Sequence, residues 1–583
     1  MLTTSDRIQD LSIKDLKELS QDIRRQILET MAHVGGHLAS NLGTVELLIA
    51  MHKVFSPPQD QFIFDTSHQI YAHKILTPRQ APFSSIRQYK GLSGFANPDE
   101  SPFDHFFAGH AGTGLSLALG VAKARDLSGE SFHVLPFICD APMGCGLTFE
   151  ALNNLPSDCK RLIIILNDNA MSISDCVGNV HHRILGRFSY PQKSHSSAKK
   201  FFEQWGLQYV GPVDGHDLET LIPLLEAHKD TLRPIVIHAL TVKGWGYKQA
   251  VEKPIAYHGV KPFDIDSGTF HPASNAPTFP KIFGQYLLEL TSFDTSIVTV
   301  TPAMPQGSGL MPLMKQYPER CIDVGIAEGH AVTFAGGLSA QGKTVFACIY
   351  STFFQRAFDN AFQDVCLQKL PVIFALDRSG LSPRDGVTHH GIYDVGFLQT
   401  LPHLIITQPR DGNLLKDLMF SAMAWKQPSV IRYPNLPTTS DTDRTPIQRS
   451  IGKGEVIAQG NGLCIIALGT MVDIARKVRA MLLPKGIVAT IIDPIFIKPL
   501  DEELLRNMLP SHDTFITLEE HALSGGFGRI VNTFLLQESS IPLRVRNLGI
   551  GDHFVEQGSY DELMQELGLT PAKIVEEIQQ LYL

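Results

Sequence analysis

Val134-Leu135-Pro136-Phe137-Ile138-Cys139-Asp140 is the segment of this 583-residue chain that indicates its fold class most directly. It is a short apolar run that ends in a polar residue, which is typical of a strand buried on both faces of a parallel sheet. A Gly-rich turn and a helical pattern over residues 147–153 follow, and a second apolar run, residues 162–166, leads into Asn167-Asp168-Asn169. The order predicts a strand–helix–strand unit whose polar residues lie at the carboxyl edge of a sheet.

Strand-length apolar runs bounded by Gly, Asp and Asn recur along the chain. They occupy residues 344–349, 372–376, 404–407, 463–468 and 488–492, with a weaker run at 322–324. The predicted fold class is therefore α/β, with several doubly wound sheets. Two stretches without periodicity, 267–280 and 434–446, are predicted linkers. They divide the chain into three α/β domains, which we place at 1–275, 281–435 and 447–583.

Composition excludes several classes of protein. Hydrophobic residues make up 43% of the chain, so general disorder is excluded. The net charge of −9 offers no broad cationic surface, and no nucleic-acid partner is expected. No apolar run reaches the ~20 residues of a membrane span, and the first ten residues lack the apolar core of a signal peptide. The eight cysteines include no Cys-x-x-Cys pair and suggest buried reduced thiols, so a cytoplasmic protein without a membrane partner is expected.

Asp140 and Asn169 follow two neighbouring strands of the predicted sheet. One strand–helix–strand crossover separates them, so both are expected at the same sheet edge. A carboxylate and an amide oxygen, together with water and phosphate oxygens, suit Mg²⁺ bound to a diphosphate. The alternative is that each residue caps the helix that follows it.

The pair Asp140 and Asn169 resembles the thiamine-diphosphate motif of the transketolase superfamily. Six further stretches narrow the resemblance to the 1-deoxy-D-xylulose-5-phosphate synthase family, and together they span essentially the whole chain in that family's order. These stretches are residues 35–43, 67–74, 167–174, 211–217, 327–333 and 350–357.

The resemblance implies a function. Members of this family condense pyruvate with D-glyceraldehyde 3-phosphate, lose CO₂ and form 1-deoxy-D-xylulose 5-phosphate, the first step of the non-mevalonate isoprenoid pathway. Thiamine diphosphate and Mg²⁺ are the implied cofactors, and a homodimer is expected from the family. The three domains would be a diphosphate- and Mg-binding domain, a pyrimidine-binding domain and a transketolase C-terminal domain. Two alternatives stay open: a transketolase-like ketol transfer, and a non-catalytic divergent paralogue.

The resemblance also implies roles for individual residues. Glu328 matches the glutamate that hydrogen-bonds the aminopyrimidine of the cofactor, and Phe353 matches an aromatic residue that stacks on it. The implied catalytic residues are Glu328, His37, His68 and His389. The implied cofactor-binding residues are His68, Gly109, His110, Ala111, Ala141, Pro142, Asn169, Tyr247, Glu328, Phe353 and Arg356. The implied substrate-binding residues are His37, His258, Arg378, Asp385 and His389, and the implied metal ligands are Asp140, Asn169 and Met171.

The chain departs from the family pattern at four places. Cys139-Asp140-Ala141-Pro142 replaces Gly-Asp-Gly-Ala, and a proline has no N–H to offer a phosphate oxygen. Gly109-His110-Ala111-Gly112 replaces Gly-His-Ser-Ser, which removes two hydroxyl donors. Asn435 replaces an arginine expected on the substrate phosphate, and the segment 182–206 is shorter than in relatives. These changes put cofactor affinity and acceptor specificity in question.

Overall fold

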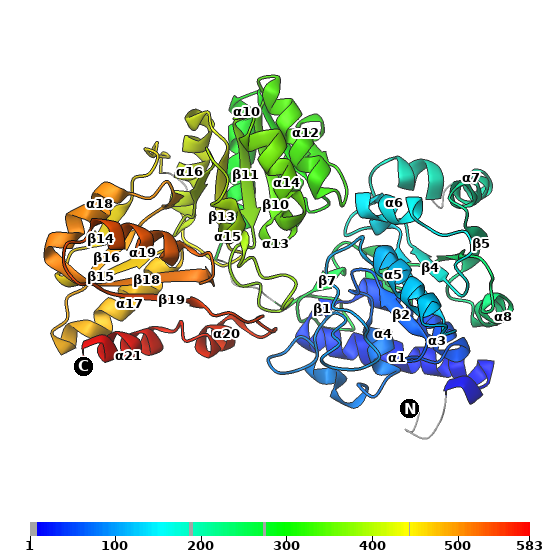
Figure 1. Cartoon of the computed structure of the whole chain (residues 1–583). Coiled ribbons are helices and arrows are strands. Elements are labelled where there is room, and N and C mark those ends of the chain that lie inside the picture. Colours follow the sequence, from blue (N-terminus) through cyan, green and yellow to red (C-terminus); the bar gives the residue numbers. More distant parts are fainter. Residues whose placement is uncertain (1–7, 186–190, 272–275, 442–443, 583) are drawn as a thin grey trace. The chain divides into compact units, whose positions relative to one another are not determined.

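Three largely parallel sheets, each flanked by helices, organise the chain in the computed structural model, which describes residues 8–185, 191–271, 276–441 and 444–582 (Figure 1). Two compact units contain them. The first is Met1–Ala273 with Gly325–Ala327, and the second is Ser274–Val324 with Glu328–Leu583. The predicted α/β class is confirmed.

The first unit is built on a five-stranded sheet in the order β2-β3-β4-β6-β5, in which every pair is parallel. Its strands, with the short pair β1 and β7, are β1 (Gly36–His37), β2 (Gln61–Phe64), β3 (Val134–Cys139), β4 (Ile163–Asp168), β5 (Gln208–Asp214), β6 (Ile235–Leu240) and β7 (Gly259–Val260). Strand β4 ends at Asp168, two residues beyond the predicted end. The reason is that Asn167 and Asp168 continue the ladder opposite Ala239 and Leu240 of β6.

Helices cover both faces of this sheet. Ile163 and Ile165 pack into one apolar cluster and Ile164 and Leu166 into another, as expected when alternate residues of a strand point to opposite faces. The helical segments of the unit are η1 (Ile8–Asp10), α1 (Ile13–Val34), α2 (Ala39–Leu42), α3 (Val45–Val54), α4 (Tyr71–Ile75), η2 (Ala81–Ser85), α5 (Gly114–Leu127), η3 (Ala141–Gly144), α6 (Gly146–Asn153), η4 (Val180–Leu185), α7 (Pro191–Gln204), α8 (Leu218–His228) and α9 (Lys248–Glu252).

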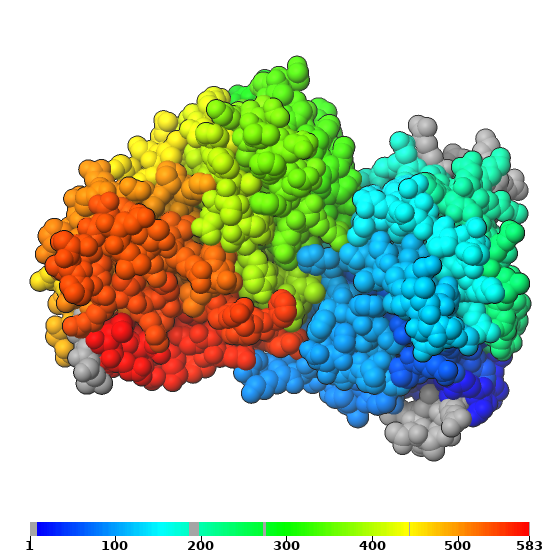
Figure 2. Space-filling model, viewed as in Figure 1, coloured from blue at the N-terminus to red at the C-terminus, as the bar shows by residue number. Residues whose placement is uncertain are grey.

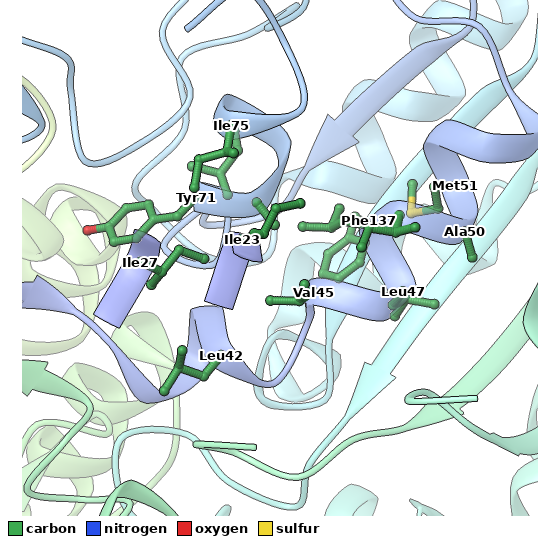
Figure 3. Packing of buried hydrophobic residues seen from close by; sticks show 14 of the residues in the cluster. Ile23, Ile27, Leu42, Val45, Leu47, Ala50, Met51, Tyr71, Ile75 and Phe137 are labelled. Carbon is green, nitrogen blue, oxygen red and sulfur yellow. The ribbon is translucent and has the colours of Figure 1, made fainter. Parts of the chain in front are cut away.

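Helix α1 shows how the sequence specifies one of these elements. Ser12 and Asp15 form a reciprocal capping box at its start, and Gly35, with φ of 78°, follows its last turn. Ile23 and Ile27 recur at helical spacing and point into the apolar cluster that also holds Phe137 of β3 (Figure 3). This packing fixes α1 against the sheet that carries Asp140.

The second unit contains two sheets. The seven-stranded sheet has the order β17-β12-β13-β11-β10-β8-β9, and the five-stranded sheet has the order β14-β16-β15-β18-β19. The strands of the first are β8 (Ile297–Thr301), β9 (Cys321–Asp323), β10 (Thr344–Tyr350), β11 (Val372–Asp377), β12 (Ile405–Thr407), β13 (Ser429–Tyr433) and β17 (Phe496–Lys498). Those of the second are β14 (Glu455–Ala458), β15 (Gly462–Ala467), β16 (Thr490–Asp493), β18 (His512–Ala522) and β19 (Arg544–Ile550).

The helical segments of the second unit alternate with these strands. They are α10 (Phe279–Phe293), α11 (Met311–Gln316), η5 (Pro318–Arg320), α12 (Glu328–Ala340), α13 (Ser351–Phe354), η6 (Gln355–Ala357), α14 (Phe358–Asn360), η7 (Ala361–Cys366), α15 (Asp394–Leu398), α16 (Gly412–Trp425), α17 (Met471–Leu482), η8 (Leu483–Lys485), α18 (Glu502–Met508), η9 (Leu509–Ser511), α19 (Phe527–Glu538), α20 (Tyr560–Glu566) and α21 (Pro571–Tyr582).

The two sheets of the second unit are joined by one apolar core and by a strand from the expected third domain. Strand β17 lies in the expected third domain, yet it pairs antiparallel with β12 at the edge of the seven-stranded sheet. One apolar cluster contains Phe374 and Leu376 of β11 together with Ile466 of β15 and Phe515 of β18. In the space-filling view the yellow-green and orange parts of the unit form a continuous surface (Figure 2).

Smaller expectations have mixed outcomes. The predicted linker 267–280 is wrong over its last two residues, because α10 begins at Phe279 and Pro280 suits a first helical turn. Residues 272–275 of that linker lie outside the described residues. The run 488–492 becomes a strand only from Thr490. All eight cysteines are buried and free, as expected. None of the helices in the described ranges combines the length and the apolar character needed to cross a membrane.

Candidate active site

Asp140 directly follows β3 and is completely buried. Its Oδ1 accepts a hydrogen bond from the backbone N–H of Ala141 at 3.0 Å, and its Oδ2 lies 3.8 Å from the thiol of Cys176. Burial, with a further contribution from the neighbouring Asp168 carboxylate, raises the pKa of Asp140 well above its ordinary value. The strand end therefore holds two acidic groups close together.

Asp168 ends β4 and is held from two sides. Its Oδ1 accepts from the N–H of Ala170 at 3.0 Å, and its Oδ2 accepts from His238 Nε2 at 2.9 Å. The other ring nitrogen of His238 accepts from the Tyr209 hydroxyl at 2.7 Å. Sequence analysis gave Asp168 no role, although its position between two asparagines was the available signal.

Asn169 lies at the start of a tight turn. Its Oδ1 accepts from the N–H of Met171 at 3.0 Å, and Ala170 between them adopts a left-handed φ of 60°. The capping alternative therefore applies to Asp140, which precedes the short η3, but not to Asn169. Asn169 and Met171 both lie in the turn that follows β4. For Asn169 this is the position expected from the sequence.

The space beside Asp140 suits a small cation. A cavity of about 10 Å³, room for about one water, is lined by Asp140, Asp168, Cys176 and His181 with three other residues. In the described part of the chain, no three His, Cys, Asp or Glu side chains are arranged as ready metal ligands. A hard ion with few protein ligands, completed by water and phosphate oxygens, fits such a donor set, and it would offset the acidic pair.

Three of the predicted histidines form one cluster in the first unit. The ring centroids of His37, His68 and His258 lie 5.4 to 5.6 Å from one another, and Phe95 packs on His37 at 5.5 Å. Burial, helped by the positive charge of Lys243, lowers the pKa of His68 to about 3. The same causes lower the pKa of His258 well below its ordinary value. These two imidazoles are therefore neutral around pH 7.

Lys243 links the histidine cluster to the acidic strand ends. Its Nζ donates to the carbonyl of Ser172 at 2.5 Å, and its side chain is almost fully buried. Burial lowers the pKa of Lys243 to about 8, although the negative charge of Asp140 opposes the shift. Lys243 was not among the residues predicted from the sequence, because a single lysine in a loop carries no spacing signal.

The loop with Gly109, His110 and Ala111 is held by Asp65, which directly follows β2. The Asp65 carboxylate accepts from the N–H of Gly112 at 2.8 Å and from the N–H of Gly114 at 2.8 Å. Gly112 has a left-handed φ of 88°, and a Cβ there would lie 2.6 Å from the Cβ of Cys145. The backbone of the loop is thus fixed even though its two expected hydroxyl groups are missing.

Tyr247 lies in a different environment from the other cofactor candidates of the first unit. Its hydroxyl donates to the carbonyl of Ile265 at 2.8 Å, and its ring packs against Tyr257 and Phe263 in the apolar core. The structure does not group it with Asp140. The shortened segment 182–206 lies partly outside the described residues.

Glu328 begins α12 in the second unit and is buried. Its Oε2 lies 3.9 Å from Nη1 of Arg356, which brings two of the predicted cofactor residues together. Burial raises the pKa of Glu328, and the positive charge of Arg356 only partly offsets this. A buried carboxyl group whose pKa is raised in this way is suited to sharing a proton with a ring nitrogen.

An aromatic group follows β10 on the same unit. The ring of Phe353 stacks on Tyr350 with centroids 5.6 Å apart, and His389 meets Phe353 edge-on at 5.6 Å. Arg378 covers the Tyr350 ring at 4.1 Å. The structure therefore brings Phe353, His389 and Arg378 into one group around Tyr350, which sequence analysis did not single out.

Arg378 is less available for binding a substrate than its position at a strand end suggests. Its Nη1 donates to the carbonyl of Gly307 at 2.8 Å and pairs with the carboxylate of Asp377. Burial raises the pKa of Asp377 to about 6 against the opposing charge of Arg378. Asp385 lies in the loop beyond, and Asn435 is exposed. The guanidinium of Arg378, which was predicted to bind substrate, therefore already has partners in Gly307 and Asp377.

Comparisons with known proteins cover most of the chain. The family model described as 1-deoxy-D-xylulose-5-phosphate synthase matches residues 1–195 and 183–241. The transketolase pyrimidine-binding domain matches 275–438, and the transketolase C-terminal domain matches 452–574.

Among curated relatives, a 1-deoxy-D-xylulose-5-phosphate synthase from Chlamydia trachomatis is 45% identical over 97% of this chain and 94% of the relative. One from Chlamydia muridarum is 45% identical over 99% and 97%. Among solved structures, a split-gene transketolase described as an inactive beta4 tetramer is 28% identical, with a TM-score of 0.47, over 52% of this chain and 98% of that one.

Proposed function

Because the chain belongs to the 1-deoxy-D-xylulose-5-phosphate synthase family, we propose that it condenses pyruvate with D-glyceraldehyde 3-phosphate to 1-deoxy-D-xylulose 5-phosphate and CO₂. The observation that carries this proposal is 45% identity over 97% of the chain. The cluster of His37, His68 and His258 beside Lys243 supports it, because it supplies several groups that can bind and protonate oxygen atoms.

The cofactors in this proposal are thiamine diphosphate and Mg²⁺. Thiamine diphosphate, when bound, supplies the electron sink that permits loss of CO₂ from a 2-keto acid. In the first unit, Asp140, Asn169 and Met171 would hold Mg²⁺, and Lys243 would balance the charge of phosphate groups. The buried acidic pair and the small cavity beside it support the role of Asp140, whereas Asn169 and Met171 lie in the adjoining turn and do not line that cavity. Pro142, which lacks an N–H, removes one expected donor.

The histidine cluster is proposed to handle the oxygen atoms of the substrates. His68 is held neutral by burial and by Lys243, which lower its pKa to about 3. A neutral imidazole can donate one hydrogen bond and accept another without adding a charge to the site. His37 and His258, whose rings adjoin it, would share this work.

Glu328 is the proposed proton-exchanging group of the second unit. Burial raises its pKa above the ordinary value of a glutamate, which favours the protonated carboxyl and suits it to proton exchange. Arg356, 3.9 Å away, limits this shift and orients the carboxyl. Phe353 would supply a flat apolar surface for a heteroaromatic ring.

Further assignments belong to the same proposal. The segments 1–275, 281–435 and 447–583 would serve as diphosphate-binding, pyrimidine-binding and C-terminal domains, in a cytoplasmic homodimer. The match of three family models to these parts of the chain supports the domain roles. Size measurement of the purified protein by light scattering tests the dimer.

The decisive experiment is an assay of CO₂ release. Purified protein with thiamine diphosphate and Mg²⁺ is given pyruvate with and without D-glyceraldehyde 3-phosphate, and the sugar product is identified by mass spectrometry. We expect product and CO₂ in equal amounts, with much slower release without the aldehyde. Conversion of ketose phosphates but not of pyruvate would favour ketol transfer instead.

One observation favours a second candidate, a non-catalytic paralogue. The residues after Asp140 are Ala141 and Pro142, and the Ala141 N–H is already used by the Asp140 carboxylate. Calorimetry with thiamine diphosphate, with and without Mg²⁺, separates the two candidates. Binding that requires Mg²⁺ supports the synthase, and absence of binding supports the paralogue.

A further inference from the structure

The loop 379–391 of the second unit carries two of the predicted substrate residues, Asp385 and His389. Its two ends meet where the N–H of Gly380 donates to the carbonyl of Gly391 and the N–H of Gly391 donates to that of Gly380, both at 2.8 Å. Within the loop, the N–H of Asp385 donates to Ser382 and that of His389 to Gly386. These short-range bonds define turns, and near His389 the loop also contacts α13, where the Thr352 hydroxyl donates to the carbonyl of Thr388 at 2.9 Å.

Glu520 of β18 reaches this loop from the C-terminal sheet. Its Oε1 accepts from the N–H of Leu381 at 2.5 Å, and its Oε2 accepts from the hydroxyl of Tyr560 at 2.7 Å. Glu520 is almost completely buried, so its carboxylate depends on these bonds to replace water. One side chain thus joins the start of the loop to the first residue of α20.

The fit between Glu520 and the loop is tight. Gly380 has a left-handed φ of 93°, and a Cβ there would lie 2.5 Å from Oε1 of Glu520. The backbone of the loop therefore lies directly against the carboxylate. A change in the position of the Glu520 side chain has to move the loop or leave the Leu381 N–H without this acceptor.

Two further bonds follow the same route. The N–H of Gly558, two residues before Tyr560, donates to the carbonyl of Pro383 in the loop at 3.0 Å. The N–H of Ala522, two residues after Glu520, donates to the carbonyl of Ile392 at 3.0 Å. The strand β18 and the segment before α20 therefore hold the loop at both of its ends.

We propose that Glu520 and Tyr560 are positioning residues that set the affinity for the phosphorylated aldehyde, acting through the loop that carries Asp385 and His389. This inference rests on the proposed function. It gives the C-terminal sheet a part in acceptor binding. A purely structural role for the two residues would lower stability without favouring one substrate over the other.

The test compares Michaelis constants for the two substrates in four variants. Glu520→Ala removes both bonds, and Tyr560→Phe removes only the hydroxyl. Glu520→Gln keeps the shape, and its amide can still accept from Leu381 and donate to Tyr560. Ser559→Ala is the matched control, because Ser559 caps α20 through Glu562, whereas the hydroxyl that donates to Glu520 belongs to Tyr560.

We expect Glu520→Ala to raise the KM for D-glyceraldehyde 3-phosphate at least about tenfold, since small displacements of binding groups are costly. The KM for pyruvate and the Kd for thiamine diphosphate should stay within about twofold. Tyr560→Phe should raise the aldehyde KM about threefold, and Glu520→Gln should restore most of the wild-type value. Ser559→Ala should lower the melting temperature and leave both KM values unchanged.

Two outcomes would overturn the inference: equal increases in both KM values, or an unchanged aldehyde KM in Glu520→Ala. Hydrogen exchange of the peptide that contains Leu381 gives a second measurement that needs no turnover. We expect faster exchange there in Glu520→Ala, and unchanged exchange would also contradict the inference. A wild-type protein without synthase activity would instead contradict the proposed function, and the exchange experiment would still test the contact.

Discussion

Asp394 in the second unit and Asp140 in the first are both buried, but their pKa values shift in opposite directions. Asp394 of the second unit pairs with Arg432, whose Nε and Nη2 lie 3.0 and 2.8 Å from its two oxygens. Burial alone would raise the pKa of Asp394, but Arg432 and His521 outweigh it, and the pKa lies below its ordinary value. Asp140 of the first unit is equally buried, yet its pKa is raised by burial and by Asp168.

The two sites differ in whether the protein itself supplies the compensating charge. At Asp394 the chain supplies its own cation, so the charge is balanced as soon as the unit folds. At Asp140 the positive charge that acts on the carboxylate is that of Lys243, whose pKa burial lowers to about 8, and the carboxylate of Asp168 opposes it. An acidic site left without full compensation is suited to an external cation.

Removing Arg432, the internal cation beside Asp394, should have the largest effect on stability. Arg432→Met leaves Asp394 buried without its main partner, and we expect a loss of about 3–5 kcal/mol in the free energy of unfolding. Urea unfolding of the second unit measures this. The matched control is Arg476→Ala, which breaks the exposed pair with Asp473 and should cost at most about 1 kcal/mol. A cost below about 1 kcal/mol for Arg432→Met would contradict the comparison.

The opposite result is expected at the acidic pair of the first unit. Asp140→Asn should weaken Mg²⁺-dependent binding of thiamine diphosphate at least about 100-fold, because a direct ligand of the proposed metal is lost. The metal-free protein should keep its stability, since one of two neighbouring buried charges disappears. Calorimetry and urea unfolding check both parts. A large loss of stability without any loss of binding would assign Asp140 a structural role.

Glu519 provides an intermediate case, because two backbone N–H groups of α19 rather than a cation face its carboxylate. They belong to Phe527 and Gly528, at 2.7 and 2.8 Å. Burial raises the pKa of Glu519 to about 7 from an ordinary 4.5, with these bonds opposing the shift. The folded state then binds the proton more tightly than the unfolded state, so stability falls as the pH rises from about 4.5 through about 7.

We expect the ionisation of Glu519 to lower the free energy of unfolding by about 2 kcal/mol between about pH 5 and about pH 8. Glu519→Gln should lower stability at low pH, because the amide can accept at only one of its two positions, and it should remove this part of the pH dependence. Thermal melts at several pH values measure the difference. Identical pH profiles for the wild type and the variant would show that Glu519 does not titrate in this range.

The smallest effect is expected at Pro142. Pro142→Ala restores a backbone N–H next to the acidic pair, and one added hydrogen bond to a phosphate should tighten cofactor binding about fivefold, or about 1 kcal/mol. Ala141→Gly adds no donor at position 142 and serves as the control. Calorimetry with thiamine diphosphate measures both. Weaker binding in Pro142→Ala would mean that the proline shapes the strand end favourably.

The sequence predicted those parts of the molecule that depend on local pattern. The strands that end at Cys139 and Asp377 were visible as apolar runs, and the histidines at positions 37, 68 and 258 were found through motif resemblance. Lys243 was missed, because its importance comes from a fold that places it near both Asp140 and His68. Contacts between residues distant in the sequence leave no periodic signal.

The same reason applies to two residues whose predicted roles stay predictions. Arg378 was implied to bind substrate, and the fold supplies Asp377 and the carbonyl of Gly307 as partners of its guanidinium. Tyr247 was expected with the cofactor residues, but its hydroxyl is bonded to Ile265 in the core. In both cases the residue type indicates which groups the side chain can bind, but tertiary packing determines whether the side chain is free to bind a ligand.

The edge strand β17 has a consequence for synthesis on the ribosome. The seven-stranded sheet begins with β8 at residue 297, but its last strand ends at residue 498, after β14, β15 and β16 of the next sheet have been made. During translation the edge strand β12 therefore lacks its antiparallel partner β17 until some 60 further residues have emerged after β13. A nascent chain stalled before β17 would expose an unpaired edge, where misassembly between neighbouring chains begins.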